Sequence, residues 1–310
     1  MSKKTGVGAC GRMSRGSAFC IRVRIALLLL LLRSRNIFLC IQIFLIIGQS
    51  IAVMDEQLFR VFGSYLGAGT VASFRYARRV VLLPVGIVAQ AVGVASYPTL
   101  SKLFVDEKYI ELKLLIRKHL SSLFLFNALM AVILIVNSEE IISLVYERGR
   151  FTSSDVKRVS SIMNIVALGV IPWSVNQIIT RAYYVQKRFW FPVMVGTTTT
   201  IVTAISLVLK NNPTEISYSI IIISFLWAYT AFMLFSLKIK NDSLLDNKLI
   251  YDIFCSVVIS LLVYSFLNYL SLDFGSNILN LFILSIISVF SFIVSIKVFR
   301  MKYVNFERRK

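Results

Sequence analysis

The sequence predicts an all-α integral membrane protein that crosses the bilayer about eight times as helices. Hydrophobic residues make up 57% of the 310 residues and charged residues only 16%, whereas a soluble domain carries about 25% charged residues. The apolar residues gather in runs of about 20 residues, the length that a helix needs to cross the hydrocarbon core. Backbone groups in that core must be satisfied within the segment, which requires helices. The period-two alternation of a membrane β-barrel is absent.

Residues 1–36 differ from everything that follows. They contain eight Lys and Arg residues and no acidic residue. Their apolar run, residues 25–32, is too short to span about 30 Å of hydrocarbon at 1.5 Å per residue. No convincing signal-peptide cleavage site follows it. We expect residues 1–36 to be a basic cytoplasmic arm that is disordered or not native to the fold.

Eight candidate spans begin at residue 37, and the helix of the first is expected to continue to about residue 66. Each is long enough to cross the bilayer with some tilt. The spans cover residues 37–54, 79–100, 119–137, 161–180, 191–209, 216–238, 250–271 and 277–299.

Lys and Arg in the connections predict the orientation, because basic connections stay on the cytoplasmic side. The basic connections are residues 101–118, 181–190 and 239–249, together with the C-terminal tail. The connections with few basic residues or balanced charge are residues 138–160, 210–215 and 272–276. Both termini are therefore expected to be cytoplasmic. The connection at about residues 67–78 departs from this pattern because it is basic on the opposite side.

The net charge of +19 would suggest nucleic-acid binding in a soluble protein. Here most Lys and Arg lie between apolar runs, where they set topology and contact anionic headgroups, so we expect no nucleic-acid partner. Four cysteines without a C-x-x-C pair and a single histidine, His119, exclude a zinc finger. No Walker loop, nucleophile elbow or zinc-protease motif is present. The sequence predicts neither an enzyme nor a metal or cofactor site.

Three arginines at the start of the second span are the main candidate residues. Arg75, Arg78 and Arg79 have the spacing that places them on one face of a helix. A charge at the bilayer centre costs about 2.5–3.5 kcal/mol, and three guanidinium groups on one face repel each other unless an anion lies between them. One interpretation is a pocket for a phosphorylated lipid, since arginine binds phosphate through a planar fork. The other is a set of interfacial arginines that reach toward headgroups.

Several short motifs resemble the MurJ (MviN) family of lipid II flippases. They are YARR at residues 76–79, LPVG at 83–86, PTLS at 98–101 and ERGRFT at 147–152, with a weaker match at RAYY, 181–184. This combination is specific, and the resemblance covers about residues 40–310. The covered part resembles the C-terminal lobe of the family.

The resemblance implies a fold and a function. Full members have fourteen spans, of which this chain would carry the last eight. Six of them, within residues 37–249, would form the second half of a MATE-like core of the MOP superfamily. Residues 250–310 would add two spans lining a lipid-tail groove and a basic cytoplasmic tail. The family moves lipid II, the lipid-linked peptidoglycan precursor, across the bacterial inner membrane by alternating access. The implied partners are lipid II, membrane lipids and a separately supplied N-terminal lobe.

Residue by residue, Arg79 matches the cavity arginine of the family, which would meet the anionic lipid head. Arg78 and Arg75 lie beside it and are included in the predicted site. Arg60, a charge close to the first apolar run, and Glu147 and Arg148, in the ERGRFT motif, are secondary candidates.

The resemblance speaks against a sodium site and leaves two other readings open. Phe59 stands where many members have an acidic residue, and residues 197–200 are threonines where asparagine is frequent. One alternative function is a related exporter of polysaccharide-linked lipids or drugs. The other is a non-transporting membrane remnant or scaffold. Without the N-terminal lobe, the chain alone is expected not to flip lipid.

Overall fold

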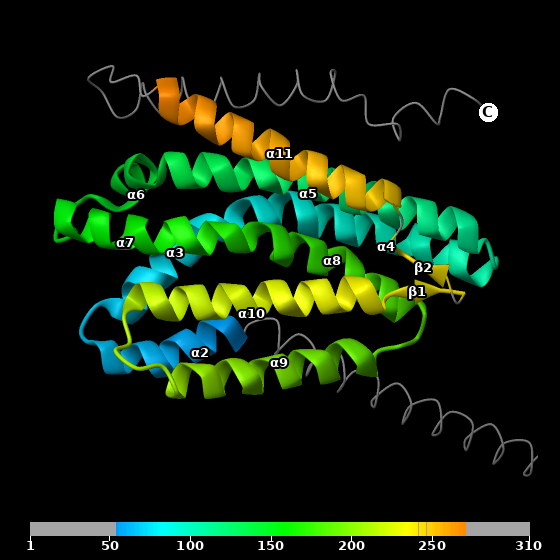
Figure 1. Cartoon of the computed structure of the whole chain (residues 1–310), viewed down its shortest axis with the longest axis horizontal. Helices are drawn as coiled ribbons and strands as arrows, with labels where there is room; N and C mark the ends of the chain where they lie inside the picture. The colour runs from blue at the N-terminus through cyan, green and yellow to red at the C-terminus, as the bar shows by residue number, and fades with distance from the viewer. Residues whose placement is uncertain (1–53, 241, 246, 271–310) are drawn as a thin grey trace, which may run out of the picture. The chain divides into compact units, whose positions relative to one another are not determined.

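The computed structural model describes residues 54–240, 242–245 and 247–270, which all belong to one compact unit, Gly48–Lys310 (Figure 1). The predicted arm and the spans predicted at residues 37–54 (Met54 apart) and 277–299 lie outside these residues. In chain order the elements are α2 (Met54–Gly63), η1 (Ser64–Leu66), α3 (Thr70–Pro84), η2 (Val85–Ala89), α4 (Gln90–Val105), α5 (Tyr109–Val136), α6 (Ser138–Tyr146), α7 (Ser153–Val166), η3 (Ala167–Gly169), α8 (Val170–Val185), α9 (Trp190–Val208), α10 (Glu215–Ser236), β1 (Lys238–Ile239), β2 (Asp242–Ser243) and α11 (Asn247–Leu270).

Five helical segments of the described part are long and apolar enough to cross a membrane. They are Thr70–Val105, Tyr109–Val136, Ser153–Val185, Trp190–Val208 and Glu215–Ser236. Each coincides with one predicted span, from the second to the sixth, so the predicted fold class is confirmed. The predicted total of eight spans is not confirmed. Helix α11 covers the seventh predicted span, but its apolar stretch is the shorter segment Leu249–Leu262. Within the described residues, helical structure extends from Met54 to Leu66 through α2 and η1, in agreement with the expected end of the first helix.

The segment Thr70–Val105 joins α3 and α4 through the π-helix η2. Pro84 lacks an N–H and its ring crowds the preceding turn, and η2 begins directly after it. One prediction is wrong here, because residues 67–78 are not a connection. They form a glycine turn followed by the first turns of α3, where Phe74 and Ala77, the residues directly before Arg75 and Arg78, are buried in the core.

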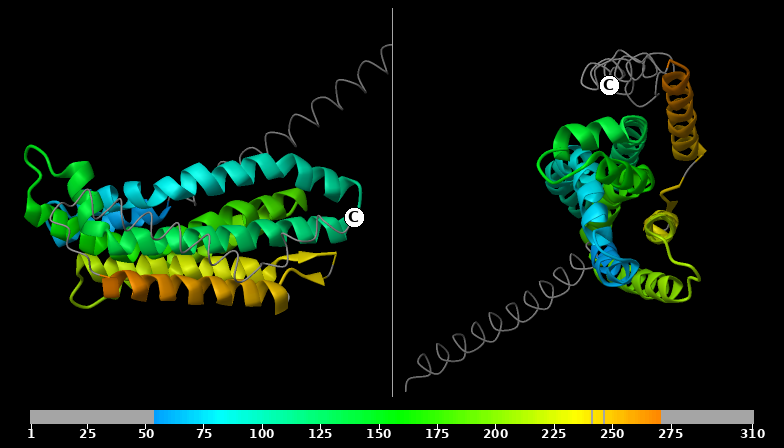
Figure 2. Two further views of the ribbon diagram at one scale, coloured as in Figure 1. Left: turned by 90° about the horizontal axis from the view of Figure 1, so that it is seen from above. Right: turned by 90° about the vertical axis from the view of Figure 1, so that its left-hand side faces the viewer.

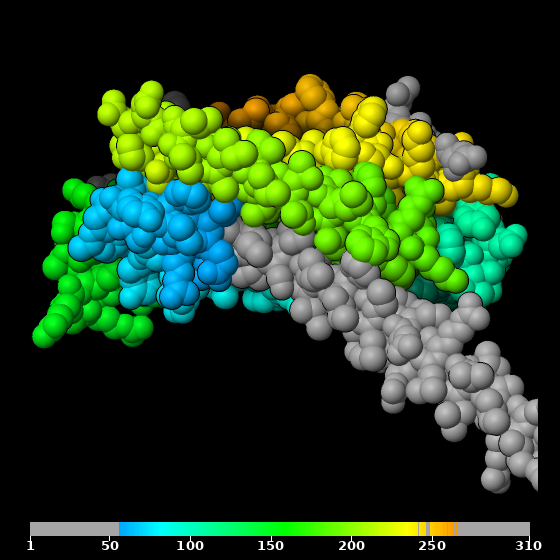
Figure 3. Space-filling model, turned by 90° about the horizontal axis from the view of Figure 1, so that it is seen from below, coloured from blue at the N-terminus to red at the C-terminus, as the bar shows by residue number. Residues whose placement is uncertain are grey.

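The described helices lie side by side with their long axes roughly parallel (Figure 2). Helix α5 packs against α8 and α11, α3 packs against α7, and α10 packs against α9, α7 and α8. Helix α2 lies against α9 and α10, and Figure 3 shows α2 and α9 on the same face. Polar contacts also join helices across the apolar core; for example, the buried Tyr183 hydroxyl on α8 donates to the Met233 carbonyl of α10 at 3.0 Å.

The connections gather at two opposite ends of this bundle (Figure 1). The α4–α5 and α8–α9 turns lie at one end with the antiparallel β1–β2 hairpin. The α2–α3, α6–α7 and α9–α10 connections lie at the other. Buried Arg117 of α5 donates from Nε to the Leu244 carbonyl at 2.9 Å, which fastens the segment after the hairpin to α5. A hydrogen bond to a charged donor of this kind contributes about 1.5–3 kcal/mol.

Candidate functional site

The candidate site is the face of α3 that carries the three arginines, and a carboxylate lies between two of them. Glu56 Oε2 on α2 accepts a hydrogen bond from Arg78 Nη1 at 2.9 Å, and Glu56 Oε1 lies 3.4 Å from Arg75 Nε. The negative charge offsets the repulsion that the spacing predicts. The sequence shows Glu56 as a charge near the first span but not as the partner of these arginines.

The Arg78 side chain is largely buried and contacts two neighbouring helices. Only 11% of its side chain is exposed, and its Cζ lies 5.4 Å from the ring centroid of Trp173 on α8. A guanidinium over a tryptophan ring is stabilised by the ring quadrupole. Arg78 therefore links α3 to both α2 and α8, whereas 48% of the Arg75 side chain is exposed and its contact with Glu56 is longer.

Arg79 differs from its two neighbours. Its side chain is exposed, and no acidic side chain among the described residues forms an ion pair with it. Tyr146, at the end of α6, lies close enough to Arg79 for an electrostatic interaction. Burial raises the pKa of the Tyr146 phenol, and the positive charge of Arg79 acts against that rise. Of the three arginines, Arg79 is the one whose charge the described part of the protein leaves without a counter-ion.

An aromatic contact brings two of the sequence motifs together. Tyr76, in the YARR motif of α3, has its ring centroid 4.8 Å from that of Tyr146 and 5.8 Å from that of Phe151. Tyr146 immediately precedes the ERGRFT motif and Phe151 lies within it, with 6.0 Å between their rings. Such ring pairs contribute about 0.5–1.5 kcal/mol beyond area burial. The motifs therefore form one structural unit beside Arg79.

The secondary candidates in the ERGRFT motif lie in the exposed α6–α7 connection. Glu147 Oε1 accepts a hydrogen bond from Ser153 Oγ at 2.9 Å, and the Ser143 hydroxyl also donates to this carboxylate. These hydroxyl donors, Ser143 first, lower the pKa of Glu147. Arg148 is exposed in the same connection, where its backbone N–H donates to the Tyr146 carbonyl at 2.7 Å. Glu147 thus bridges α6 and α7.

The N-cap of helix α7 is Thr152, which forms a capping box with Asp155. The Asp155 Oδ2 atom accepts hydrogen bonds from both the backbone N–H and the hydroxyl of Thr152, each at 2.9 Å. A capping box satisfies two donors that the first turn would otherwise leave open.

The remaining predicted positions do not join the arginine face. Arg60 is exposed in the last turn of α2. Phe59 is fully buried and stacks on Phe74, with ring centroids 3.8 Å apart. Each hydroxyl of residues 197–200 donates to the carbonyl four residues earlier on α9. In the described ranges, no group of three His, Cys, Asp or Glu residues is placed to hold a metal ion.

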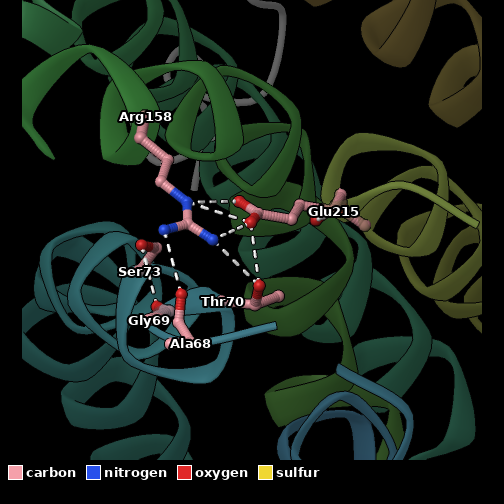
Figure 4. Close-up of polar contacts among 7 residues, drawn as sticks. Ala68, Gly69, Thr70, Ser73, Arg158 and Glu215 are labelled. Carbon is pink, nitrogen blue, oxygen red and sulfur yellow. Dashed lines mark hydrogen bonds and ion pairs between the residues drawn. The ribbon is translucent and has the colours of Figure 1, made fainter. Parts of the chain in front are cut away.

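The sequence reasoning missed an ion pair between α7 and the start of α10. Arg158 and Glu215 face each other beside the first residues of α3 (Figure 4). Arg158 is one of the basic residues of the predicted connection 138–160, in which basic and acidic residues are equal in number. Both residues lie in connections of the predicted topology, residues 138–160 and 210–215, so the search for charges inside spans did not point to this pair.

Arg181 was also misplaced, because it lies inside α8 rather than in the connection after it. Its Nη1 donates to the Gln177 carbonyl at 2.5 Å and to Gln177 Oε1 at 3.0 Å. It faces α4 so closely that a Cβ on Gly93 would overlap its guanidinium group. Arg181 is thus a half-buried cation in a candidate span.

Apolar helices of spanning length, with arginines inside them, define a multi-pass α-helical membrane protein. The family model described as lipid II flippase MurJ matches residues 32–295. The chain belongs to this family.

The chain is similar to several curated members of the family. A probable lipid II flippase MurJ of Buchnera aphidicola subsp. Acyrthosiphon pisum is 21% identical over 275 residues, which cover 84% of this chain and 53% of the relative. The Thermotoga maritima protein of the same description is 34% identical over 129 residues, or 42% of this chain and 26% of that protein. The chain spans about half the length of the first of these relatives.

A solved structure shows the same fold. A lipid II flippase MurJ in an inward closed conformation superimposes with a TM-score of 0.69 at 23% sequence identity. The match covers 84% of this chain and 53% of that one.

Proposed function

We propose that this chain is the lipid-binding half of a lipid II flippase of the bacterial inner membrane. In this proposal it acts as a transporter without a cofactor and contributes a wet chamber that receives the anionic head of lipid II. A second, N-terminal half would complete the path. The observation that carries the proposal is the exposed guanidinium of Arg79 on a helix of membrane-spanning length, for which the described residues provide no carboxylate partner.

The charge arrangement supports an anionic ligand. An unpaired cation at membrane depth is costly unless it faces water or an anion. Glu56 already neutralises part of the charge of Arg75 and Arg78, so the added anion would meet Arg79 first. A guanidinium binds pyrophosphate through two parallel hydrogen bonds. Membership of the MurJ family supports lipid II as the source of that pyrophosphate.

The first test measures binding of purified lipid II to the chain in nanodiscs. Arg79→Ala should weaken binding by about tenfold to a hundredfold, since one charge-assisted contact of about 1.5–3 kcal/mol is lost. Arg150→Ala is the matched control: it removes an exposed arginine of the α6–α7 connection and should bind normally. Equal affinity of parent and Arg79→Ala would contradict the assigned role of Arg79.

The second test measures transport in bacteria depleted of their own flippase. The chain is expressed alone and together with the N-terminal half of a relative. Rescue of growth in either arm, lost on Arg79→Ala, supports the proposal. Absence of rescue in both arms, with normal membrane insertion, would favour a non-transporting remnant.

A further inference from the structure

Arg158 on α7 joins three segments of the bundle through one guanidinium group (Figure 4). Its Nε donates to both carboxylate oxygens of Glu215, at 2.9 and 3.0 Å, in the first turn of α10. Its Nη2 donates to Thr70 Oγ1 at 2.9 Å, and its Nη1 donates to the Ala68 carbonyl at 3.2 Å. The Thr70 hydroxyl in turn donates to Glu215 Oε1 at 2.8 Å. We name these four residues the Arg158 clamp.

The clamp holds a helix start that has no cap of its own. Helix α3 is preceded by Gly69 in the left-handed region, φ +85°, and no side chain caps its first turn. A Cβ on Gly69 would lie 2.9 Å from Arg158 Nη1, so the guanidinium packs directly on this turn. Within α3 itself, the Ser73 hydroxyl donates to the Gly69 carbonyl at 3.0 Å. The other side-chain contacts on this turn come from Arg158 of α7 and Glu215 of α10.

A displacement of this start would be carried to the candidate site. Thr70 is completely buried, and Phe74 and Ala77, one and two turns later, are also buried. Helix α3 is continuous from Thr70 to Pro84, and Arg79 lies nine residues after Thr70, or about 13.5 Å along the axis. Protein interiors are close-packed and transmit small shifts instead of absorbing them.

We propose that Arg158 and Glu215 are positioning residues that set the direction of Arg79 by holding the start of α3. This inference rests on the proposed function, because it assigns the clamp to the same anion-binding face. Arginine is required at position 158, since a planar fork reaches Glu215, Thr70 and Ala68 together, whereas the compact ammonium of lysine does not. Thr70 is the part of the clamp through which α3 is held.

The test measures the distance between spin labels at Leu83→Cys and Ile216→Cys, both exposed positions, in a chain without its four natural cysteines. We expect Arg158→Lys and Thr70→Val to shift or broaden the distance distribution. Thr70→Ser keeps the hydroxyl and should keep the parent distribution. Lys157→Gln, at the exposed neighbouring position of α7, should also leave it unchanged. An unchanged distribution in Thr70→Val would overturn the role of the clamp.

Lipid II affinity separates positioning from simple stabilisation. Thr70→Val and Arg158→Lys should weaken binding by about tenfold, equivalent to about 1.4 kcal/mol, while Thr70→Ser retains parent affinity. If the Arg158–Glu215 pair only stabilised the fold, these variants would have a lower melting temperature but the parent spin-label distance and the parent affinity. That result would contradict the proposal.

The outcome also distinguishes the clamp from the proposed function. Loss of binding in Arg79→Ala, with native distance and affinity in Thr70→Val, would reject the clamp and leave the proposed function standing. Normal binding in Arg79→Ala would remove the proposed site, while the spin-label distances would still decide whether Arg158 holds α3.

Discussion

At the scale of single residues, the three arginines of α3 are not equivalent. Arg78 is nearly buried and bound on two sides, Arg75 shares the same carboxylate at a longer distance, and Arg79 is exposed without a described carboxylate. The spacing in the sequence predicts one shared face but cannot rank its members. The ranking comes from Glu56, a residue 22 positions before Arg78.

Glu56→Gln tests this ranking. Removing the carboxylate leaves Arg75 and Arg78 as unscreened like charges, and we expect a loss of about 1–2 kcal/mol in stability. Thermal unfolding in detergent measures it. Glu111→Gln, which breaks an exposed pair with Lys108 at 4.0 Å, is the matched control and should change stability by less than about 0.5 kcal/mol. Equal effects of the two changes would show that Glu56 does not neutralise the arginine face.

At the scale of elements, the sequence predicts the helices well where apolar residues are continuous. The five spanning segments coincide with predicted spans because hydrocarbon demands length and apolarity. The prediction fails at residues 70–78, since alternating arginines and buried residues hide the first turns of α3 from a search for apolar runs. It also fails for contacts between distant positions, such as Arg158 with Glu215, 57 residues apart. Such pairs depend on which helices become neighbours.

The α6–α7 connection provides a pH-dependent prediction at this scale. Glu147 bridges Ser143 of α6 and Ser153 of α7, and these hydroxyls lower its pKa from the ordinary value of 4.5. A lowered folded-state pKa means that the bridge stabilises the connection above the ordinary pKa. That contribution is lost as the pH falls through the folded-state pKa.

A carbon-13 NMR titration of the Glu147 carboxyl group measures this shift. We expect a pKa below 4.5 in the parent, and a rise toward the ordinary value in Ser143→Ala and, to a smaller extent, in Ser153→Ala. Ser154→Ala is the control, because the Ser154 hydroxyl contacts Thr152 and not Glu147. A rise of the same size in the control would contradict the assigned hydrogen bonds.

At the scale of the whole described bundle, its two ends differ in charge. The hairpin end carries exposed basic side chains in excess over acidic ones. The basic ones are Lys102, Lys108, Lys118, Lys187, Arg188, Lys238 and Lys240, and the acidic ones are Asp106, Glu107, Glu111 and Asp242. The opposite end has exposed residues of both signs in its α6–α7 connection. This grouping agrees with the connections that the sequence assigns to opposite sides, because those connections lie at opposite ends in space (Figure 1).

This charge asymmetry predicts the orientation of the bundle in the membrane, which can be measured directly. Lys and Arg in short connections stay on the cytoplasmic side during insertion, where anionic lipids also attract them. We therefore expect a membrane-impermeant maleimide, added outside spheroplasts, to label Arg150→Cys and Asn211→Cys but not Lys108→Cys. In all three variants the four natural cysteines are replaced. All three should react after the membrane is permeabilised. Labelling of Lys108→Cys from outside would reverse the orientation. It would also place the α6–α7 connection, and with it the end of the bundle where the Arg158 clamp lies, on the cytoplasmic side.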